Sequence, residues 1–236
     1  AEFMVNGLAT GRQAYASVTT LSDGNFLVAW MEELGPFLGG AGSPNGQIKA
    51  REFTAAGTPV GGEFLIGSAA ASNILPSVTA VAGGGFAIAY NTGGIGGSAV
   101  MQVFDSANAQ VGGTTTLNSF ANGLPYAGLK TLTDGNIVAV LNNTTGSPAF
   151  TARVLTPAGV QVGNDMTFGV GPNGSLISGL AALTSGGFAV SYWAVNGSQT
   201  SLMMTGFLAE ELTTNIQLAS VSTATVNPNF LSATLS

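Results

Sequence analysis

The sequence contains no cysteine and no histidine, and only 5 Lys or Arg and 11 Asp or Glu among 236 residues. Without cysteine the chain has no disulfide, no thiol nucleophile and no thiolate metal site. Without histidine it has no Ser-His-Asp triad and no imidazole base or metal ligand. We therefore expect no metal, no cofactor and no catalytic residue, and we predict that the chain is not an enzyme.

Charge is scarce as well. Charged residues make up 7% of the chain, against about 25% in an ordinary soluble domain. Its surface must therefore consist of Ser, Thr, Asn, Gln and Gly, which suits a secreted or cell-surface protein. A net charge of −6 with scattered cations predicts no nucleic-acid partner. No apolar run approaches the roughly 20 residues that span a bilayer, so we expect no membrane insertion, and the chain start lacks a signal-peptide pattern.

A glycine turn between apolar segments occurs four times. The turn glycines are separated by 60, 51 and 51 residues: Gly24, Gly84, Gly135 and Gly186. A second segment, of the same length in each copy, follows each turn. It reads IKAREFTAAGTPVGGEFLIG (48–67) in the first copy and SLMMTGFLAEELTTNIQLAS (201–220) in the fourth. The fourth copy lacks the glycines of the others, as terminal repeats often do. The sequence is therefore a tandem repeat.

Each repeat is expected to form four short strands, because apolar residues alternate with small or polar ones on both sides of each turn. The Asp-Gly-Asn and Gly-Gly sequences supply the positive-φ positions that tight hairpins need. A period near 51 residues with four strands per unit is typical of a β-propeller blade. We predict an all-β, propeller-like array of four-stranded blades, with a β-solenoid as the alternative.

We expect one repeat domain over 1–236, with a partial strand at each end. Residues 1–7 (AEFMVNG) match residues 62–68 (GEFLIGS), so the chain opens on a fourth strand that has no unit before it. Residues 229–236 (NFLSATLS) resemble the first strand of a further unit. These surplus strands predict self-association through exchanged terminal strands, or completion by other subunits. The expected divisions are terminal strand 1–10, repeats 11–71, 72–122, 123–173 and 174–223, and terminal strand 224–236.

Four segments carry a resemblance to a known repeat: Pro76-Ser77-Val78, Asp23 through Trp30, Ile48 to Phe53, and Gly57 through Ile66. They are similar to a tandem repeat of very large secreted bacterial proteins, many of them RTX-type exoproteins exported by type I secretion. The resemblance covers nearly the whole chain. It implies an extracellular, propeller-like structural or adhesive module without known catalytic residues. The calcium-binding nonapeptide of such proteins is absent, since GGIGGSAV (93–100) has no Asp.

Aromatic and apolar residues supply the candidate contact sites. Trp30, Tyr90 and Tyr192 end equivalent strands, and these rings either stack on a sugar or cap the core between blades. Trp193, beside Tyr192, should point to the opposite face and is the best single candidate for a partner contact. A long connection from Met31 to Gly46 carries Phe37 and Leu38, which have no equivalents in the other repeats. Long loops in compact domains are often functional.

The carboxylates favour structural roles over catalysis. Glu32-Glu33 and Glu210-Glu211 are neighbours, and neighbours in a strand point to opposite faces. Asp23 and Asp134 precede turn glycines, where a carboxylate bonds the backbone. The sequence predicts a non-catalytic structural or adhesive module; the alternatives are a glycan-binding propeller and a carboxylate-dependent hydrolase. One position should be buried and equivalent in every blade: Phe26, Phe86, Ile137 and Phe188.

Overall fold

The structure is a computed structural model, and its described part is almost entirely β-strand. No helix in that part is both long and apolar enough to cross a membrane. The described residues are 2–7, 11–33, 46–67, 72–93, 97–119, 127–142, 149–169, 176–196, 199–209 and 212.

The strands form four antiparallel sheets, each from one consecutive stretch of chain. Blade 1 contains β1 (Gln13–Thr20), β2 (Phe26–Glu33), β3 (Gly46–Phe53) and β4 (Pro59–Ile66). Blade 2 contains β5 (Asn73–Ala80), β6 (Phe86–Thr92), β7 (Ser98–Phe104) and β8 (Gln110–Ser119). Blade 3 contains β9 (Ala127–Thr131), β10 (Ile137–Asn142), β11 (Phe150–Leu155) and β12 (Gln161–Phe168). The described strands of blade 4 are β13 (Leu176–Ala182), β14 (Phe188–Asn196) and β15 (Gln199–Phe207).

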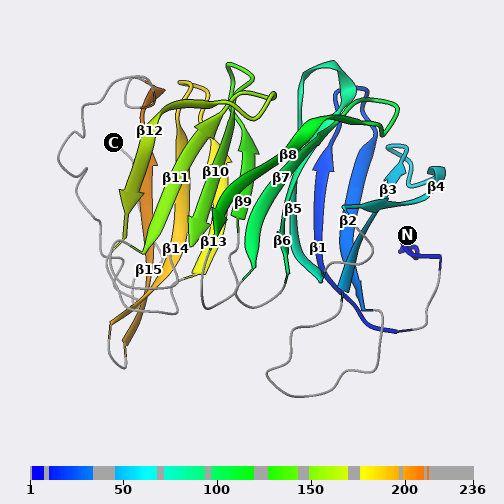
Figure 1. Cartoon of the computed structure of the whole chain (residues 1–236), viewed down its shortest axis with the longest axis horizontal. Coiled ribbons are helices and arrows are strands. Elements are labelled where there is room, and N and C mark those ends of the chain that lie inside the picture. The colour runs from blue at the N-terminus through cyan, green and yellow to red at the C-terminus, as the bar shows by residue number, and fades with distance from the viewer. Residues whose placement is uncertain are drawn as a thin grey trace.

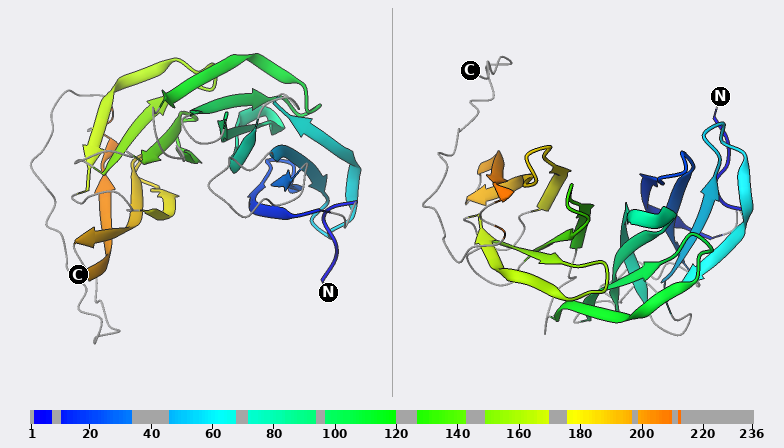
Figure 2. Two further views of the ribbon diagram at one scale, coloured as in Figure 1. Left: turned by 60° about the horizontal axis from the view of Figure 1, so that its bottom comes forward. Right: turned by 90° about the horizontal axis from the view of Figure 1, so that it is seen from above.

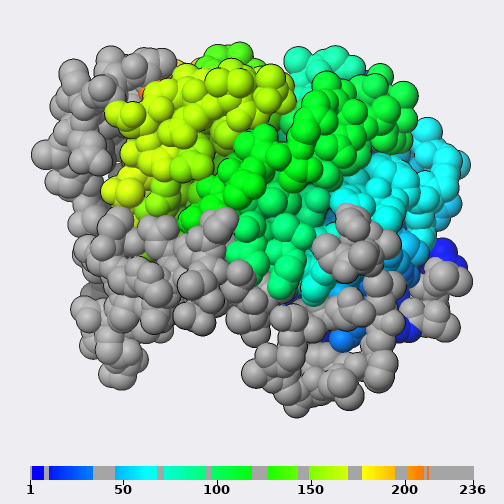
Figure 3. All heavy atoms as spheres, in the orientation of Figure 1, coloured from blue at the N-terminus to red at the C-terminus, as the bar shows by residue number. Residues whose placement is uncertain are grey.

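The sheets stand face to face along an arc, with their first strands on its inner side and β4, β8 and β12 on its outer side (Figures 1 and 2). Figure 3 shows blades 1, 2 and 3 following one another across one face of the molecule. Figure 2 shows the arc open between blade 4 and blade 1. The predicted array of propeller blades is confirmed. The solenoid alternative is wrong, because the pairing of the described strands stays within each repeat and no sheet runs through successive repeats.

Local sequence explains the hairpins that start each blade. Gly24 and Gly135 take φ values of 88° and 87°, which a side chain would oppose. One carboxylate oxygen of Asp23 accepts from the backbone of Asn25 at 2.9 Å, and that of Asp134 accepts from Asn136 at the same distance. The predicted structural role of both aspartates is confirmed.

Apolar side chains fill the space between successive blades. Leu27, Met31 and Ile66 of blade 1 pack with Phe86 and Ile88 of blade 2 in one buried cluster. Comparable clusters join blade 2 to blade 3 and blade 3 to blade 4. A blade therefore depends on its neighbours to bury both of its faces.

The four equivalent positions at the start of each second strand largely behave as predicted. Phe86, Ile137 and Phe188 are fully buried between blades. Phe26 is only half-buried, so that part of the prediction is wrong. The reason is positional: these residues face the preceding blade, and among the described residues blade 1 has none before it.

Hydroxyl groups link the inner strands of neighbouring blades. The backbone N–H of Val78 donates to the Ser17 hydroxyl at 3.1 Å, and that of Leu129 donates to Ser77 at 3.0 Å. Ser17 and Ser77 hold the same place in the repeat. Bonds of this kind satisfy backbone donors near the inner side of the arc, where neighbouring sheets are not hydrogen-bonded to each other through their backbones.

Candidate functional site

One candidate site is the face of blade 1 that is turned away from blade 2, called here the blade 1 end face. Val18 on β1 is 63% exposed there, whereas its equivalent Val78 in blade 2 is 6% exposed. Tyr15 is also exposed on the same strand. The difference arises because Val78 is covered by blade 1, while no blade formed by the described residues covers Val18. An apolar side chain that is buried at the equivalent position of blade 2 is thus exposed on blade 1.

Residues 2–7 cover part of this face. Val5 packs with Val28, Trp30 and Phe53, and the Phe3 ring lies 5.4 Å from that of Phe53. Glu2 to Asn6 form no strand, which differs from the predicted terminal strand. A strand needs a hydrogen-bonded neighbour, and the described residues provide none beside this segment.

The position of residues 2–7 is nevertheless that of an outer strand. Arg51 of blade 1 donates to the Val5 carbonyl at 3.4 Å. Arg153, the equivalent of Arg51 in blade 3, donates to the Leu117 carbonyl on β8 at 2.8 Å. Val5 therefore lies on blade 1 as Leu117 lies on blade 3. The segment occupies the place of the fourth strand of a preceding blade.

A polar cluster borders the same end face. The Lys49 Nζ lies 2.9 Å from Glu32 and 3.2 Å from Glu63, and the backbone N–H of Gly7 donates to Glu63. The hydrogen bond from Lys49 to Glu32 is the largest influence and raises the Lys49 pKa despite burial. Burial favours the neutral form of Glu63, but the bonds from Gly7 and Lys49 outweigh it and lower the pKa. Lys49 and Glu63 therefore stay ionised at neutral pH, so neither is poised to transfer a proton.

The face of blade 4 turned away from blade 3, the blade 4 end face, is a second exposed surface. Trp193 is 44% exposed, and its strand partner Leu202 is exposed beside it. Met204 is 69% exposed, whereas its equivalent Met101 in blade 2 is 1% exposed. Blade 3 covers Met101, and no described residue does the same for Met204. Met204 at this end of the arc is therefore exposed for the same reason as Val18 at the other end.

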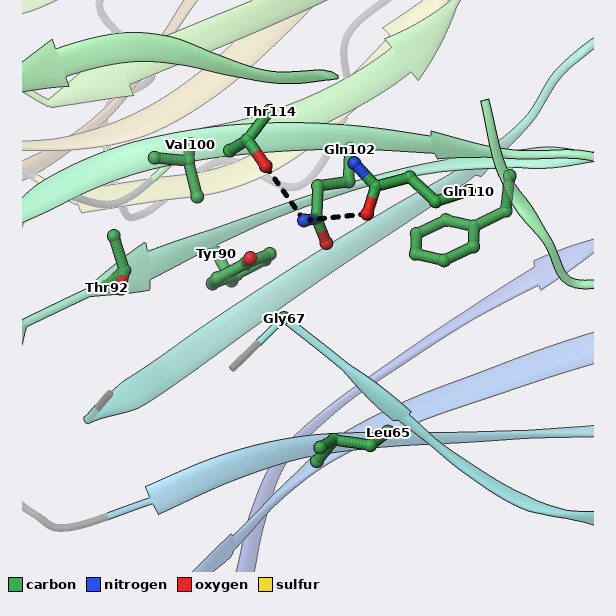
Figure 4. Close-up of a pocket in the computed structure, with 9 residues that line it drawn as sticks. Leu65, Gly67, Tyr90, Thr92, Val100, Gln102, Gln110 and Thr114 are labelled. Carbon is green, nitrogen blue, oxygen red and sulfur yellow. Dashed lines mark hydrogen bonds between the residues drawn. The ribbon is translucent and has the colours of Figure 1, made fainter. Parts of the chain in front are cut away.

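A pocket of about 520 Å³ opens between blades 1 and 2 (Figure 4). Gln102 on β7 donates to Thr114 at 2.9 Å and to Gln110 at 3.2 Å. The burial of Tyr90 raises its pKa to about 12. The pocket is lined by Leu65, Gly67, Tyr90, Thr92, Val100, Gln102, Phe104, Gln110 and Thr114. The sequence analysis missed this pocket, although the aligned AREF, MQVF and ARVL segments already show Gln102 in the place of an arginine.

The predicted contact residues have different surroundings. Trp193 is exposed, as expected from its alternation with Tyr192. Trp30 is 4% exposed, and Tyr192 is equally buried in the core between blades 3 and 4. Burial leaves neither ring free to stack on a sugar. Tyr192 caps the core between two blades, as expected, whereas Trp30 packs with Val5 and Phe53 on the blade 1 end face. Phe37 and Leu38 lie outside the described residues.

The remaining acidic candidates do not converge. Glu32 joins the polar cluster, and Glu210 and Glu211 lie outside the described residues. Within the part of the chain that the structure describes, no three Asp or Glu side chains are grouped so that they could hold a metal ion.

No protein-family model and no curated protein matches this sequence. Solved structures do match the fold. A protein of unknown function from Dyadobacter fermentans is 13% identical with a TM-score of 0.55, over 82% of this chain and 65% of that one. The Hadza microbial sialidase Hz136 is 10% identical with a TM-score of 0.55, over 82% of this chain and 44% of that one. A mannose phosphorylase from Leishmania mexicana is 10% identical with a TM-score of 0.49.

These likenesses show the fold and correct one prediction. The chain spans about two thirds of the first protein and less than half of the sialidase. The prediction that the chain is not an enzyme is wrong as a conclusion from composition, because part of an enzyme, the sialidase, has a similar fold. The absence of His and Cys removes particular mechanisms, but it does not remove catalysis from this fold.

Proposed function

We propose that this chain is a structural module of an extracellular assembly, in which copies join head to tail. The blade 1 end face of one copy docks on the blade 4 end face of the next. The observation that carries this proposal is the position of residues 2–7, which lie on blade 1 as the fourth strand of a blade whose other strands are missing from the described residues.

The second copy covers what the described residues leave open at each end. Residues 2–7 of one copy lie beside β15, the last described strand of blade 4 in its neighbour. Val18 and Tyr15 then meet Trp193 and Met204 of that neighbour, so that exposed apolar side chains on both sides become buried. An unpaired strand is a ready partner for a sheet edge, and main-chain hydrogen bonds hold the two together.

The geometry of the contact determines the kind of assembly. The two end faces differ, so the contact is heterologous and leaves one free face at each end of a dimer. Such contacts produce a ring if the rotation closes and a filament if it does not. Few charges oppose the approach, because the chain has only 16 charged side chains. The resemblance to tandem repeats of large secreted proteins agrees with this extended role.

Two surface variants test the proposal. Val18→Asp should block the blade 1 end and Trp193→Lys the blade 4 end, and each variant alone should form no species larger than a monomer in sedimentation. An equimolar mixture should form a dimer and nothing larger, since one intact face of each kind remains. Val160→Asp is the matched control, because Val160 is as exposed as Val18 but lies on neither end face.

Three results would overturn the proposal. The first is a wild-type chain that stays monomeric at every accessible concentration. The second is a mixture of the two variants that yields no dimer. The third is a chain lacking residues 1–7 that assembles as well as the intact chain, because blade 4 would then not need that strand.

A further inference from the structure

The pocket between blades 1 and 2 exists because of a replacement within the repeat. In blade 3, Arg153 forms a two-point ion pair with Asp165, at 2.7 and 2.6 Å, and also reaches the Leu117 carbonyl of blade 2. The equivalent residues in blade 2 are Gln102 and Thr114. Glutamine is shorter than arginine, and its amide bonds to Thr114 and Gln110 instead of reaching the strand before it. The space that arginine fills elsewhere is left as a pocket.

The amide of Gln102 is only half satisfied. Its nitrogen has two acceptors, but its oxygen is buried and has no hydrogen-bond partner. Gln102 is 6% exposed, so desolvation of this acceptor carries a cost that a ligand donor would remove. Figure 4 shows the oxygen on the opposite side of the amide from Thr114, toward the part of the pocket where Gly67 lies.

The remaining lining defines the chemistry of a ligand. None of the lining side chains is charged at neutral pH, which disfavours an ionic ligand. Thr92, Gln110 and Thr114 offer hydroxyl and amide groups, while Leu65 and Phe104 offer apolar surface. A ring that carries hydroxyl groups around its edge and C–H groups on its face matches this combination.

We propose that this pocket binds one neutral sugar residue, with a sugar hydroxyl donating to the Gln102 amide oxygen. A volume of about 520 Å³ lies in the range of small-molecule sites. Gly67 lets the chain after β4 lie close to Tyr90 on one side of the pocket, because a Cβ there would lie 2.5 Å from the Tyr90 hydroxyl. The site is separate from both end faces, so it operates whether or not the chain assembles.

Binding is measured on the full chain by saturation-transfer NMR and calorimetry. The probes are D-glucose, D-galactose, D-mannose and N-acetyl-D-glucosamine, with the anionic N-acetylneuraminic acid as a fifth. At least one neutral sugar should bind, and the anionic sugar should not bind. Failure of all four neutral sugars to bind the wild-type chain overturns the proposal, as does binding of the anionic sugar alone.

Variants assign the binding to Gln102. Gln102→Leu should weaken the affinity at least tenfold, and the double variant Gln102→Arg with Thr114→Asp, which copies blade 3, should abolish binding by filling the pocket. Gln161→Leu is the control, because Gln161 is the equivalent of Gln110 in blade 3 and lies outside the pocket. Melting temperatures without sugar show that each variant is folded. Unchanged affinity in the folded double variant overturns the proposal.

Discussion

At the scale of single residues, burial depends on which blades stand on either side. Phe86 packs on Phe104 with ring centroids 4.8 Å apart and on Phe64 at 6.2 Å. Phe26 holds the same place in the repeat and stacks on Phe53, but none of the four described sheets precedes it and covers it. Identical side chains in equivalent positions therefore contribute differently to stability.

The first prediction compares these two phenylalanines. Phe86→Ala should lower the free energy of unfolding by about 3 to 5 kcal/mol, because it removes a fully buried ring and leaves a cavity. Phe26→Ala should lower it by less, since part of that ring already contacts water. Urea unfolding of both variants measures the difference. Equal losses would mean that blade 1 has a covering partner in solution.

The second prediction concerns Tyr90 at alkaline pH. Burial raises its pKa to about 12 in the folded chain, against about 10 in an unfolded chain. The protonated form therefore stabilises the fold fully below pH 10, and this contribution, about 2 to 3 kcal/mol, disappears as pH rises from 10 to 12. Tyr90→Phe should flatten the fall of stability across that range. A fall of stability in Tyr90→Phe as steep as that of the wild-type chain would contradict the assignment.

At the scale of elements, the third and fourth strands of a blade are joined through side chains as well as through the backbone. Arg153 on β11 connects to Asp165 on β12 and to the Leu117 carbonyl on β8. One side chain therefore ties two strands of blade 3 to the outer strand of blade 2. The hydrogen bond with Asp165 raises the Arg153 pKa above its ordinary value, so the guanidinium remains charged.

The third prediction replaces Arg153 and Asp165 with the residue types that blade 2 has at the equivalent positions. Arg153→Gln should lower the free energy of unfolding by about 1 to 2 kcal/mol, because it removes charge-assisted hydrogen bonds that are partly exposed to solvent. Adding Asp165→Thr should recover part of the loss, since the unpaired carboxylate is then gone. Thermal and urea unfolding of the single and double variants test this. A double variant less stable than the single one would refute the reasoning.

At the scale of the whole molecule, the arc is held by contacts between adjacent blades, as in other repeat proteins. Several carboxylates stabilise the blades by accepting hydrogen bonds within their own turns or by pairing with Lys and Arg side chains. The engaged carboxylates include those of Asp23, Glu32, Glu63, Asp134 and Asp165.

The fourth prediction follows from this arrangement. A calcium site needs six to eight oxygen ligands, commonly with several carboxylates, and no three described carboxylates are grouped so that they could hold a metal ion. A chelator should therefore leave the melting temperature unchanged within experimental error. Calorimetric scans with and without EDTA, at constant pH and ionic strength, provide the measurement. A fall of several degrees would show that a metal ion stabilises the fold.

The amino-acid sequence by itself determined the repeat, the four strands of a blade and the turns between them. These features depend on neighbours within a few residues: Gly24 permits a positive φ, Asp23 bonds its own turn, and alternation sets the faces of β2. The equivalence of residues 1–7 with 62–68 was also visible in the sequence, and it correctly anticipated where Val5 lies.

Only the tertiary structure decided which of the equivalent positions are covered. Val18 and Val78 have the same place in the repeat, yet one is exposed and the other buried, because coverage depends on a sheet that is distant in sequence. The same holds for Met204 and Met101. The sequence showed that Gln102 stands where other blades have arginine. Its consequence, an open pocket against blade 1, required the distance between two sheets, and local sequence patterns do not contain that distance.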